Sequence, residues 1–309
     1  MLEMIDFTQY SQNLRAYGGS AGRKLGIEMD GENYIVKFPG NLKEKNLKNI
    51  QLSYSNSPVC EYIGSHIYES IGIPVHETKL GYYNDKVVVG CKDFLADNEQ
   101  LIEFEKIKVT FLPHFVDSNG DETNGTGVDF KEILLTIKEH PLLQQLPGVE
   151  DRFWDMFVGD AIIGNPDRNN ANWGIIKNGQ NLRLAPVYDN GNCLNNKWDD
   201  LKMQDTLQDP IKLSAEAYKR KVCIFELNKH HIKPYELIAS KKNKECNKAV
   251  KRIVPRIDLK KIYNIIDEIP CISEIQRQFY KAVITERYQK VLLPTLQQLT
   301  QGNILDLIR

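Results

Sequence analysis

Two stretches of alternating apolar and polar residues in the first third of the chain predict β-hairpins. The first, LGIEMDGENYIVKFP (25–39), alternates on both sides of Asp30-Gly31, a common hairpin turn. The second, VHETKLGYYNDKVVVGCKDF (75–94), alternates around Asn84-Asp85. We therefore expect a small β-sheet within residues 1 to about 94.

Apolar residues at helical spacing predict one helix between these hairpins. Its stripe consists of Ile63, Ile67 and Ile71. Ser57 is the expected N-cap, and Pro58 suits the first turn. Gly72 can end the helix, because glycine adopts the left-handed conformation there without strain.

The pattern beyond residue 94 is mainly helical. Helical patches over 95–150 are interrupted by the turn-rich stretch DSNGDETNGTG (117–127), and the last hundred residues are also mostly helical. One apolar face recurs with the helical period at Trp154, Phe157, Val158, Ala161 and Ile162. Together these patterns predict an α+β fold with two lobes, a β-rich one over 1–94 and a helical one over 95–309.

A polar loop and a third hairpin follow the apolar helix. The stretch GNPDRNNANWG (164–174) is too polar to continue the helix, which we expect to end near Gly164. WGII then indicates a strand, KNGQ a tight turn and NLRLAPVYD the returning strand. With the turn centred on Asn178-Gly179, Asn172 should lie opposite Ala185.

This hairpin should bring three oxygen-bearing side chains together. Asp167 and Asp189 fall just beyond its open end, near Asn172. Carboxylate and amide oxygens suit Mg²⁺, which usually binds one or two carboxylates plus substrate phosphates. Asn172 and Asp189 flank the hairpin most closely and are the candidate metal ligands, which leaves Asp167 to accept a proton from a hydroxyl. Phosphoryl transfer requires this division of roles. Turn and cap formation is the alternative explanation for so many Asp and Asn residues.

The N-terminal third favours phosphoryl transfer. YGGSAGRK (17–24) places three glycines before the first hairpin, where backbone N–H groups can approach phosphates. Lys37 is a lone cation in an apolar strand, and Glu61 lies early in the next helix. In kinases such a lysine holds the α- and β-phosphates and such a glutamate holds the lysine. Each feature alone has a structural explanation: a turn, a surface lysine and an acid near a helix N-terminus.

The strand VVVGCKDF leads into the second lobe, and its backbone at Cys91 to Phe94 can hydrogen-bond an adenine between the lobes. The candidate nucleotide-binding residues are therefore Gly18, Gly19, Ser20, Gly22, Lys24, Lys37, Glu61, Cys91, Lys92, Asp93 and Phe94.

Composition and charge add one feature to this picture. The chain of 309 residues is 41% hydrophobic with a net charge of −1, which argues against disorder. Residues 212–261 carry fifteen basic and five acidic side chains, a surface that can meet an acidic partner or an anionic membrane. A solvated helical surface is the preferred interpretation, and we expect no sequence-specific nucleic acid partner.

Nothing in the sequence predicts secretion through a signal peptide, a membrane span or a structural metal. The N-terminus MLEMIDFTQY lacks a basic start and an apolar run, and no apolar stretch approaches ~20 residues. The six cysteines are scattered and suit reduced thiols in the cytoplasm. The stretch from Asp117 resembles a calcium loop only at its start, because Glu122 and Val128 replace the required glycine and glutamate.

With these residues placed, the chain resembles the HipA-like serine/threonine kinases, and most closely their short forms, which lack an extra N-terminal domain. The segments that carry the resemblance are NYIVKFP, CEYIGSHIYESIGI, VVVGCKDF, FWDMFVGDAIIGNPDRNNANWGII and LAPVYDNGNCL. It implies an ATP- and Mg²⁺-dependent enzyme that phosphorylates protein Ser/Thr and often itself. Asp167 would be the base, Asn172 and Asp189 the Mg²⁺ ligands, Lys37 the contact to ATP phosphates and residues 91–94 the hinge.

The chain departs from the family pattern at two places. Asn169 stands where the family usually has histidine, two residues after the catalytic aspartate, and the short GGSAGRK replaces a longer glycine-rich pattern. Ser20 is the candidate autophosphorylation site in that short loop. The resemblance also allows an antitoxin-like or host-protein partner, and delivery to another cell without a signal peptide.

Two other functions fit parts of the sequence. DRNNANW and YDNG are also similar to the type II phosphatidylinositol 4-kinases, which would make the substrate a lipid. Because Asn169 replaces the usual histidine, a nucleotide-binding pseudokinase that acts as a regulatory or toxin-like module is the third hypothesis.

Overall fold

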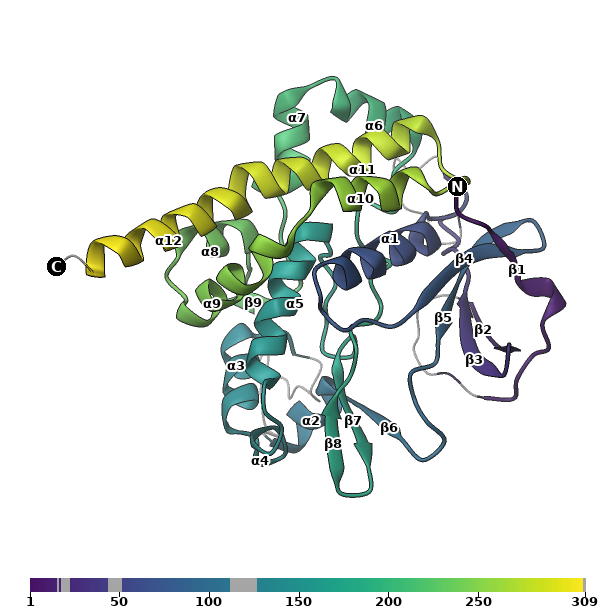
Figure 1. The fold of residues 1–309 in the computed structure, drawn as a ribbon, viewed down its shortest axis with the longest axis horizontal. Helices are drawn as coiled ribbons and strands as arrows, with labels where there is room; N and C mark the ends of the chain where they lie inside the picture. Colours follow the sequence, from purple (N-terminus) through teal and green to yellow (C-terminus); the bar gives the residue numbers. More distant parts are fainter. Residues whose placement is uncertain (16, 18–22, 44–51, 112–126, 308–309) are drawn as a thin grey trace.

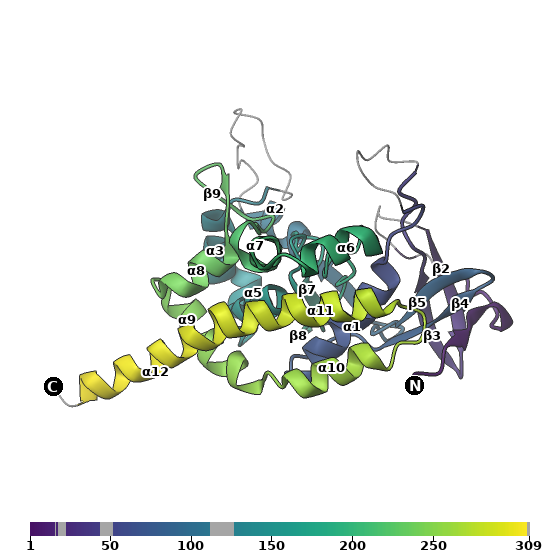
Figure 2. The same ribbon diagram turned by 90° about the horizontal axis from the view of Figure 1, so that it is seen from above.

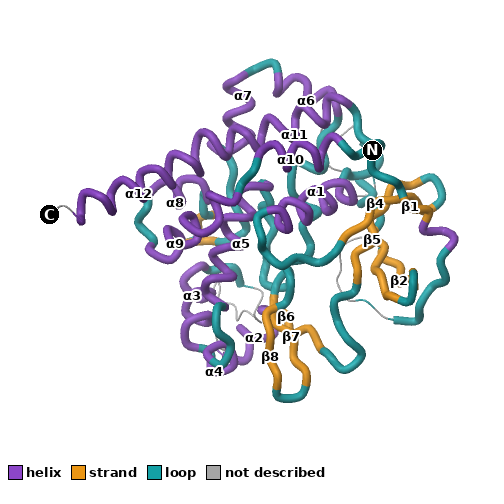
Figure 3. Tube along the Cα trace, in the orientation of Figure 1, coloured by secondary structure: helices purple, strands orange, loops and turns teal. Residues whose placement is uncertain are grey.

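The structure, a computed structural model, describes residues 1–15, 17, 23–43, 52–111 and 127–307. The five-stranded sheet lies at one end of the molecule, and most of the helices lie toward the other end (Figures 1 and 3). The expected α+β fold is therefore confirmed, and the division at residue 94 stays a prediction.

The β-rich end is a five-stranded sheet in the order β1-β4-β5-β3-β2. Its strands are β1 (Ile5–Asp6), β2 (Lys24–Met29), β3 (Glu32–Lys37), β4 (Thr78–Tyr83) and β5 (Lys86–Lys92). A 3₁₀ turn, η1 (Phe7–Gln9), follows β1, which pairs with β4 in parallel; the other neighbours are antiparallel. The two predicted hairpins are confirmed as β2–β3 and β4–β5, with Asp30, Gly31 and Asn84 at positive φ, as such turns require.

The helix between the hairpins is α1 (Ser57–Ser70), and it packs against β4 and β5. Its predicted N-cap is wrong, because Ser57 is already helical and its hydroxyl lies 2.8 Å from that of Ser55. Asn56 occupies the cap position, but its amide donates to the carbonyl of Trp198 rather than to the helix. Gly72 follows the helix at φ 73°, as expected.

The helical end is built around α5. Its helices are α2 (Phe104–Phe111), α3 (Phe130–Glu139), α4 (Pro141–Gln144), α5 (Val149–Ile163), α6 (Asp200–Leu207), α7 (Pro210–Ser214), η2 (Ala215–Lys219), α8 (Pro234–Ser240), α9 (Lys244–Ile253), η3 (Val254–Arg256), α10 (Leu259–Asp267), α11 (Glu274–Arg287), η4 (Tyr288–Leu292) and α12 (Leu293–Leu307). The predicted apolar face of α5 is buried. Figure 2 shows α11, η4 and α12 as one long rod along one side of the molecule.

The third predicted hairpin forms, with a shifted register. β7 (Gly174–Asn178) and β8 (Asn181–Leu184) pair with Asn178 opposite Asn181, so the turn is Gly179-Gln180 rather than Asn178-Gly179. Gly179 takes the first turn position at φ 59°, which glycine adopts without strain. The predicted pairing of Asn172 with Ala185 is therefore wrong, since the Ala185 N–H donates to the Gly174 carbonyl.

The strand β6 and the strand pair β9–β10 were not predicted. β6 (Gln100–Glu103) adds a third strand beside β7, and β9 (Glu226–Leu227) pairs with β10 (His230–His231). Both are too short to show a clear alternating pattern. All six cysteines are free thiols, as expected, and within the described parts of the chain no helix has the length and apolar character of a membrane span.

Candidate active site

The polar loop after α5 begins where the sequence predicts. Gly164 ends the helix at φ 68°, in the left-handed conformation. The loop then folds back on itself, because the amide nitrogen of Asn172 donates to the carbonyl of Asp167 at 2.8 Å. The Asp167 N–H donates to the side chain of Asn165. The two residues five positions apart are thus fixed relative to each other before any ligand binds.

The carboxylate of Asp167 is held by two amides. Asn192 donates to its Oδ2 at 2.6 Å, and Asn169 lies at 3.5 Å from its Oδ1. Burial raises the pKa of Asp167 above its ordinary value; the two amides oppose this, and the charge of Asp189 adds to it. A half-buried carboxylate of raised pKa, anchored by neutral donors, is suited to accept a proton.

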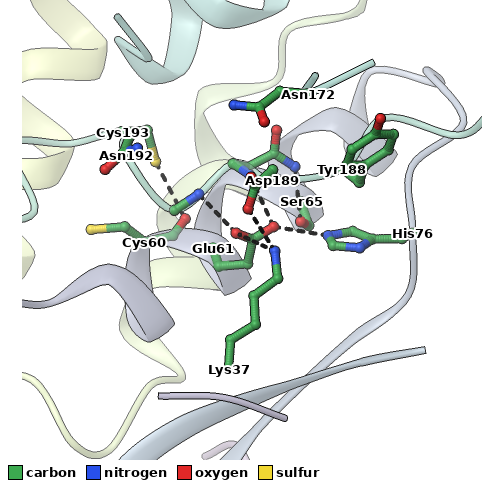
Figure 4. Close-up of polar contacts among 12 residues, drawn as sticks. Lys37, Cys60, Glu61, Ser65, His76, Asn172, Tyr188, Asp189, Asn192 and Cys193 are labelled. Atoms are coloured by element: carbon green, nitrogen blue, oxygen red, sulfur yellow. Dashed lines mark hydrogen bonds and ion pairs between the residues drawn. The ribbon is translucent and has the colours of Figure 1, made fainter. Parts of the chain in front are cut away.

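Asp189 lies on the loop after β8, with its backbone in the left-handed region at φ 61°. This conformation is uncommon for a residue other than glycine, although aspartate adopts it more readily than most. Its Oδ1 lies 2.7 Å from the Lys37 ammonium, which comes from β3 of the five-stranded sheet (Figure 4). Burial alone would lower the pKa of Lys37, but Glu61 and Asp189 hold it well above the usual value.

Glu61 of α1 is buried and bonded through both oxygens (Figure 4). Oε2 accepts from Lys37 at 3.4 Å and from the Gly191 N–H at 2.8 Å; Oε1 accepts from the Asn190 N–H at 2.9 Å and contacts His76 at 2.9 Å. Burial would raise the pKa of Glu61, but these partners hold it far below the usual range. Glu61 therefore links α1, β3 and the loop that carries Asp189.

His76 is a part of this network that sequence reasoning missed. It is buried, and one of its ring nitrogens, a carboxylate oxygen of Glu61 and the Sγ of Cys91 lie within 4.8 Å of one another. Burial raises the pKa of the Cys91 thiol, so that thiol is neutral. The short contact between His76 and Glu61 gives the cluster a positioning role, since the imidazole fixes the carboxylate that holds Lys37.

Replacing His76 should destabilise the protein and loosen the position of the Glu61 carboxylate. In His76→Leu, one oxygen of a buried carboxylate loses a partner, so we expect the free energy of unfolding to fall by about 1–3 kcal/mol and the KM for ATP to rise. Thermal unfolding and initial rates measure both quantities. The matched control is His66→Leu, a half-buried histidine of α1 whose ring bonds the Tyr62 carbonyl. Equal effects of the two substitutions would contradict the assigned role.

Arg168 is a second residue that sequence reasoning missed. Its buried guanidinium makes a two-point ion pair with Asp160 of α5, at 2.9 and 3.0 Å. It also donates to the carbonyls of Asn172 and Tyr188 and, at 2.6 Å, to the side chain of Asn190. Arg168 thus ties the loops of the candidate base and the candidate metal ligands to one helix. The available signal was Asp160, the one acid within the apolar second half of the helix, residues 156–163.

The candidate hinge consists of the end of β5 and the two residues that follow it. Cys91 and Lys92 end β5, and the Asp93 N–H donates to the carbonyl of Asn33 at 2.8 Å. The ring of Phe94 lies 5.7 Å from that of Tyr188, which follows β8. Adenine binding by these four residues stays a prediction.

The candidate phosphate loop lies largely outside the described residues. Gly18, Gly19, Ser20 and Gly22 belong to the part that is not described. Lys24 opens β2 and pairs opposite Lys37, and its binding role stays a prediction. The neighbouring Arg23, which sequence reasoning did not single out, lines the cleft with its guanidinium 4.6 Å above the Phe38 ring.

Two cavities meet at the candidate base. A cavity of about 150 Å³ is lined by residues that include Arg23, Lys37, Glu61, Asn172 and Asp189. A second cavity of about 460 Å³ opens beside the loop that follows Asp189. Asp167 and Asn192 line both cavities.

The residues of the smaller cavity fit a nucleotide phosphate with Mg²⁺. Asn172 uses its amide nitrogen on Asp167, which leaves the amide oxygen as a ligand atom, and Asp189 offers a carboxylate. Hard oxygen ligands of this kind suit Mg²⁺, and Lys37 and Arg23 supply positive charge for phosphates.

Comparisons with known proteins find a matching family and similar kinases. Residues 16–258 match the family described as the HipA-like C-terminal domain. The serine/threonine-protein kinase CtkA of Helicobacter pylori is 36% identical over 293 residues, which cover 93% of this chain and 86% of CtkA. The crystal structure of a Helicobacter pylori proinflammatory kinase CtkA superposes with a TM-score of 0.88 at 33% identity, covering 97% of this chain and 98% of that one.

A more distant structure shares the fold. A chain from the Shewanella oneidensis complex of HipA, HipB and operator DNA gives a TM-score of 0.58 at 14% identity, over 96% of this chain and 69% of that one.

Proposed function

Because this chain belongs to the HipA-like family and is a protein kinase by its similarity to CtkA, we propose that it transfers the γ-phosphoryl group of ATP to a serine or threonine. The proposal includes Mg²⁺ as the metal cofactor and autophosphorylation as one outcome of the activity. An antitoxin-like or host-protein partner stays a prediction.

One observation carries the proposal: Asp167 lines both the phosphate-sized cavity and the larger cavity beyond it. A hydroxyl that enters from the larger cavity would reach the Asp167 carboxylate as it meets phosphates held in the smaller one. Phosphoryl transfer depends on such positioning and on charge neutralisation more than on covalent chemistry.

The remaining residues have separate tasks in this arrangement. Lys37 contacts the phosphates, and Glu61 keeps its ammonium in place through the 3.4 Å ion pair. Asn172 and Asp189 would hold Mg²⁺, which when bound neutralises charge on the phosphates. Arg168 keeps both loops at their spacing by bonding their backbone carbonyls. Asp167 accepts the hydroxyl proton.

Product analysis tests the proposed substrate class. Purified protein is incubated with γ-labelled ATP and Mg²⁺, with a mixed protein substrate in one arm and phosphatidylinositol vesicles in the other. We expect label on serine or threonine, in the added protein and in the enzyme itself. Label confined to the lipid would replace the proposal with a lipid kinase, and ATP binding without label in either arm would indicate a pseudokinase.

The pH dependence of the rate should reflect the burial of Asp167. The base works as a carboxylate, and its pKa is raised, so kcat should fall with decreasing pH at a higher pH than an exposed aspartate of pKa about 4 would give. In Asn192→Ala the carboxylate loses a donor that favours its charged form, so the acid limb should move to still higher pH. Profiles of kcat at saturating ATP measure this, and coincident acid limbs would contradict the assignment.

A further inference from the structure

The larger cavity beyond Asp167 has a defined chemical character. It measures about 460 Å³, and its lining includes Asp167, Asn192, Asn195, Asn196, Lys197, Trp198 and Lys221. Apart from the base itself, the charged side chains that line it are the two lysines. Three amides line the same wall, and their nitrogens donate to Asp167, Glu216 and the Gly191 carbonyl.

The wall of this cavity is held rigidly. The amide of Asn196 donates to the Gly191 carbonyl at 2.6 Å, and the Asn56 N–H donates to the Asn196 carbonyl at 2.7 Å. Leu194 and Asn195 both lie in the left-handed region, at φ 52° and 56°. Residues 192–198 are therefore tied to the start of α1, and a segment that docks here meets a preformed surface.

Positive charge outweighs negative charge around the two lysines. Lys197 is exposed, whereas Lys221 is mostly enclosed and contacts Asn195 at 3.1 Å and Glu216 at 3.6 Å. A third ammonium, that of Lys202, lies 4.2 Å above the ring of Trp198. Glu216 offsets one of these three charges and the carboxylate of Asp167 offsets a second, which leaves one net positive charge around the cavity.

The pKa of Lys221 also favours an anion in this cavity. Burial and the positive charge of Arg287 together lower the pKa of Lys221 to about 8, against the opposing effect of Glu216. An ammonium in such surroundings is stabilised by an additional anion. A lysine or arginine brought by a substrate would instead add a like charge.

We propose that this cavity binds the acceptor segment of the protein substrate and selects serine or threonine flanked by aspartate or glutamate, with Lys197 and Lys221 as the specificity-determining residues. This inference rests on the proposed kinase function. The proposed substrates are acidic segments. Their aspartate or glutamate carboxylates would pair with the ammonium groups of Lys197 and Lys221, which lie beside the Asp167 carboxylate, without displacing that carboxylate.

A set of three synthetic peptides tests the preference. Each carries one serine, flanked by glutamates in the first, by alanine and glycine in the second, and by lysines in the third. We expect kcat/KM to fall in that order, with a ratio of about tenfold or more between the acidic and the basic peptide at low salt. The ratio should shrink as salt screens the charges.

Variants assign the preference to the two lysines. In Lys197→Met and Lys221→Met the acidic-to-basic ratio should fall about fivefold each, and the double charge reversal to glutamate should invert the preference. Lys221→Arg should keep it, because the charge remains. Lys248→Met is the matched control, since this exposed lysine of α9 pairs with Glu245 away from the cavity. Thermal unfolding of each variant separates lost specificity from lost folding.

The outcomes distinguish this inference from the proposed function. Asp167-dependent label on the neutral peptide, without a gain from glutamates, would overturn the acidic preference and leave the kinase function standing. Equal losses with acidic and basic peptides in the lysine variants would overturn the roles of Lys197 and Lys221. No Asp167-dependent label on any peptide, with ATP bound, would overturn both proposals.

Discussion

Asp167→Asn should lower the rate of phosphoryl transfer by about 10²- to 10⁴-fold, which is the usual contribution of a positioned general base. The asparagine has the same shape and can still accept from the amide of Asn192, so the loop should keep its fold. The amide cannot accept the hydroxyl proton as the carboxylate does. Initial rates with a serine peptide measure the loss.

The KM or dissociation constant for ATP should change little in the same variant. The proposed contacts to the phosphates come from Lys37 and from the metal that Asn172 and Asp189 would hold, and none of these residues is altered. Asn165→Ala is a useful companion, since it removes the side chain that accepts from the Asp167 N–H and donates to Asp160, and it leaves the Asp167 carboxylate in place. If Asp167→Asn transferred the phosphoryl group at the wild-type rate, Asp167 would be excluded as the base, and the raised pKa of its carboxyl would have no catalytic role.

Asp189→Asn should reduce transfer by about 10³-fold, because several kcal/mol of charge stabilisation depend on the bound metal. The substitution also removes the 2.7 Å ion pair with Lys37, which leaves that ammonium to Glu61 alone. We therefore expect a lower affinity for the Mg²⁺–ATP complex as well as a lower kcat, whereas Asp167→Asn should lower kcat alone. Titration of Mg²⁺ at fixed ATP measures the first effect.

Asp205→Asn is the matched control for this prediction, because Asp205 is an exposed aspartate of α6 that pairs with Lys212 outside both cavities. It should retain the wild-type Mg²⁺ dependence. An unchanged Mg²⁺ requirement in Asp189→Asn would assign the metal to other residues.

The candidate site could be predicted from sequence where its residues follow regular elements. Asp167, Asn172 and Asp189 flank a hairpin whose alternation is visible, so their convergence survived an error in the hairpin register. Lys37 and Glu61 were found because each departs from an apolar pattern, on a strand and on a helix. Their 3.4 Å contact joins residues 24 positions apart, which only the fold itself establishes.

The supporting residues could not be found in this way. Arg168, His76 and Asn192 act through contacts between elements far apart in sequence, and such contacts leave no periodic pattern. The turn shift at Gly179 has a local cause: the tight turn uses the positive φ of glycine at its first position. The strand β6 is recognisable only through its pairing with β7.

The most direct test follows the γ-phosphate of labelled ATP into a serine peptide, with the wild type, Asp167→Asn and Asp189→Asn measured side by side at one Mg²⁺ concentration. The account predicts label on the peptide serine with the wild type, its near loss in both variants, and ATP binding retained by Asp167→Asn. Label of wild-type intensity in both variants would contradict the account, because neither carboxylate would then take part in the transfer.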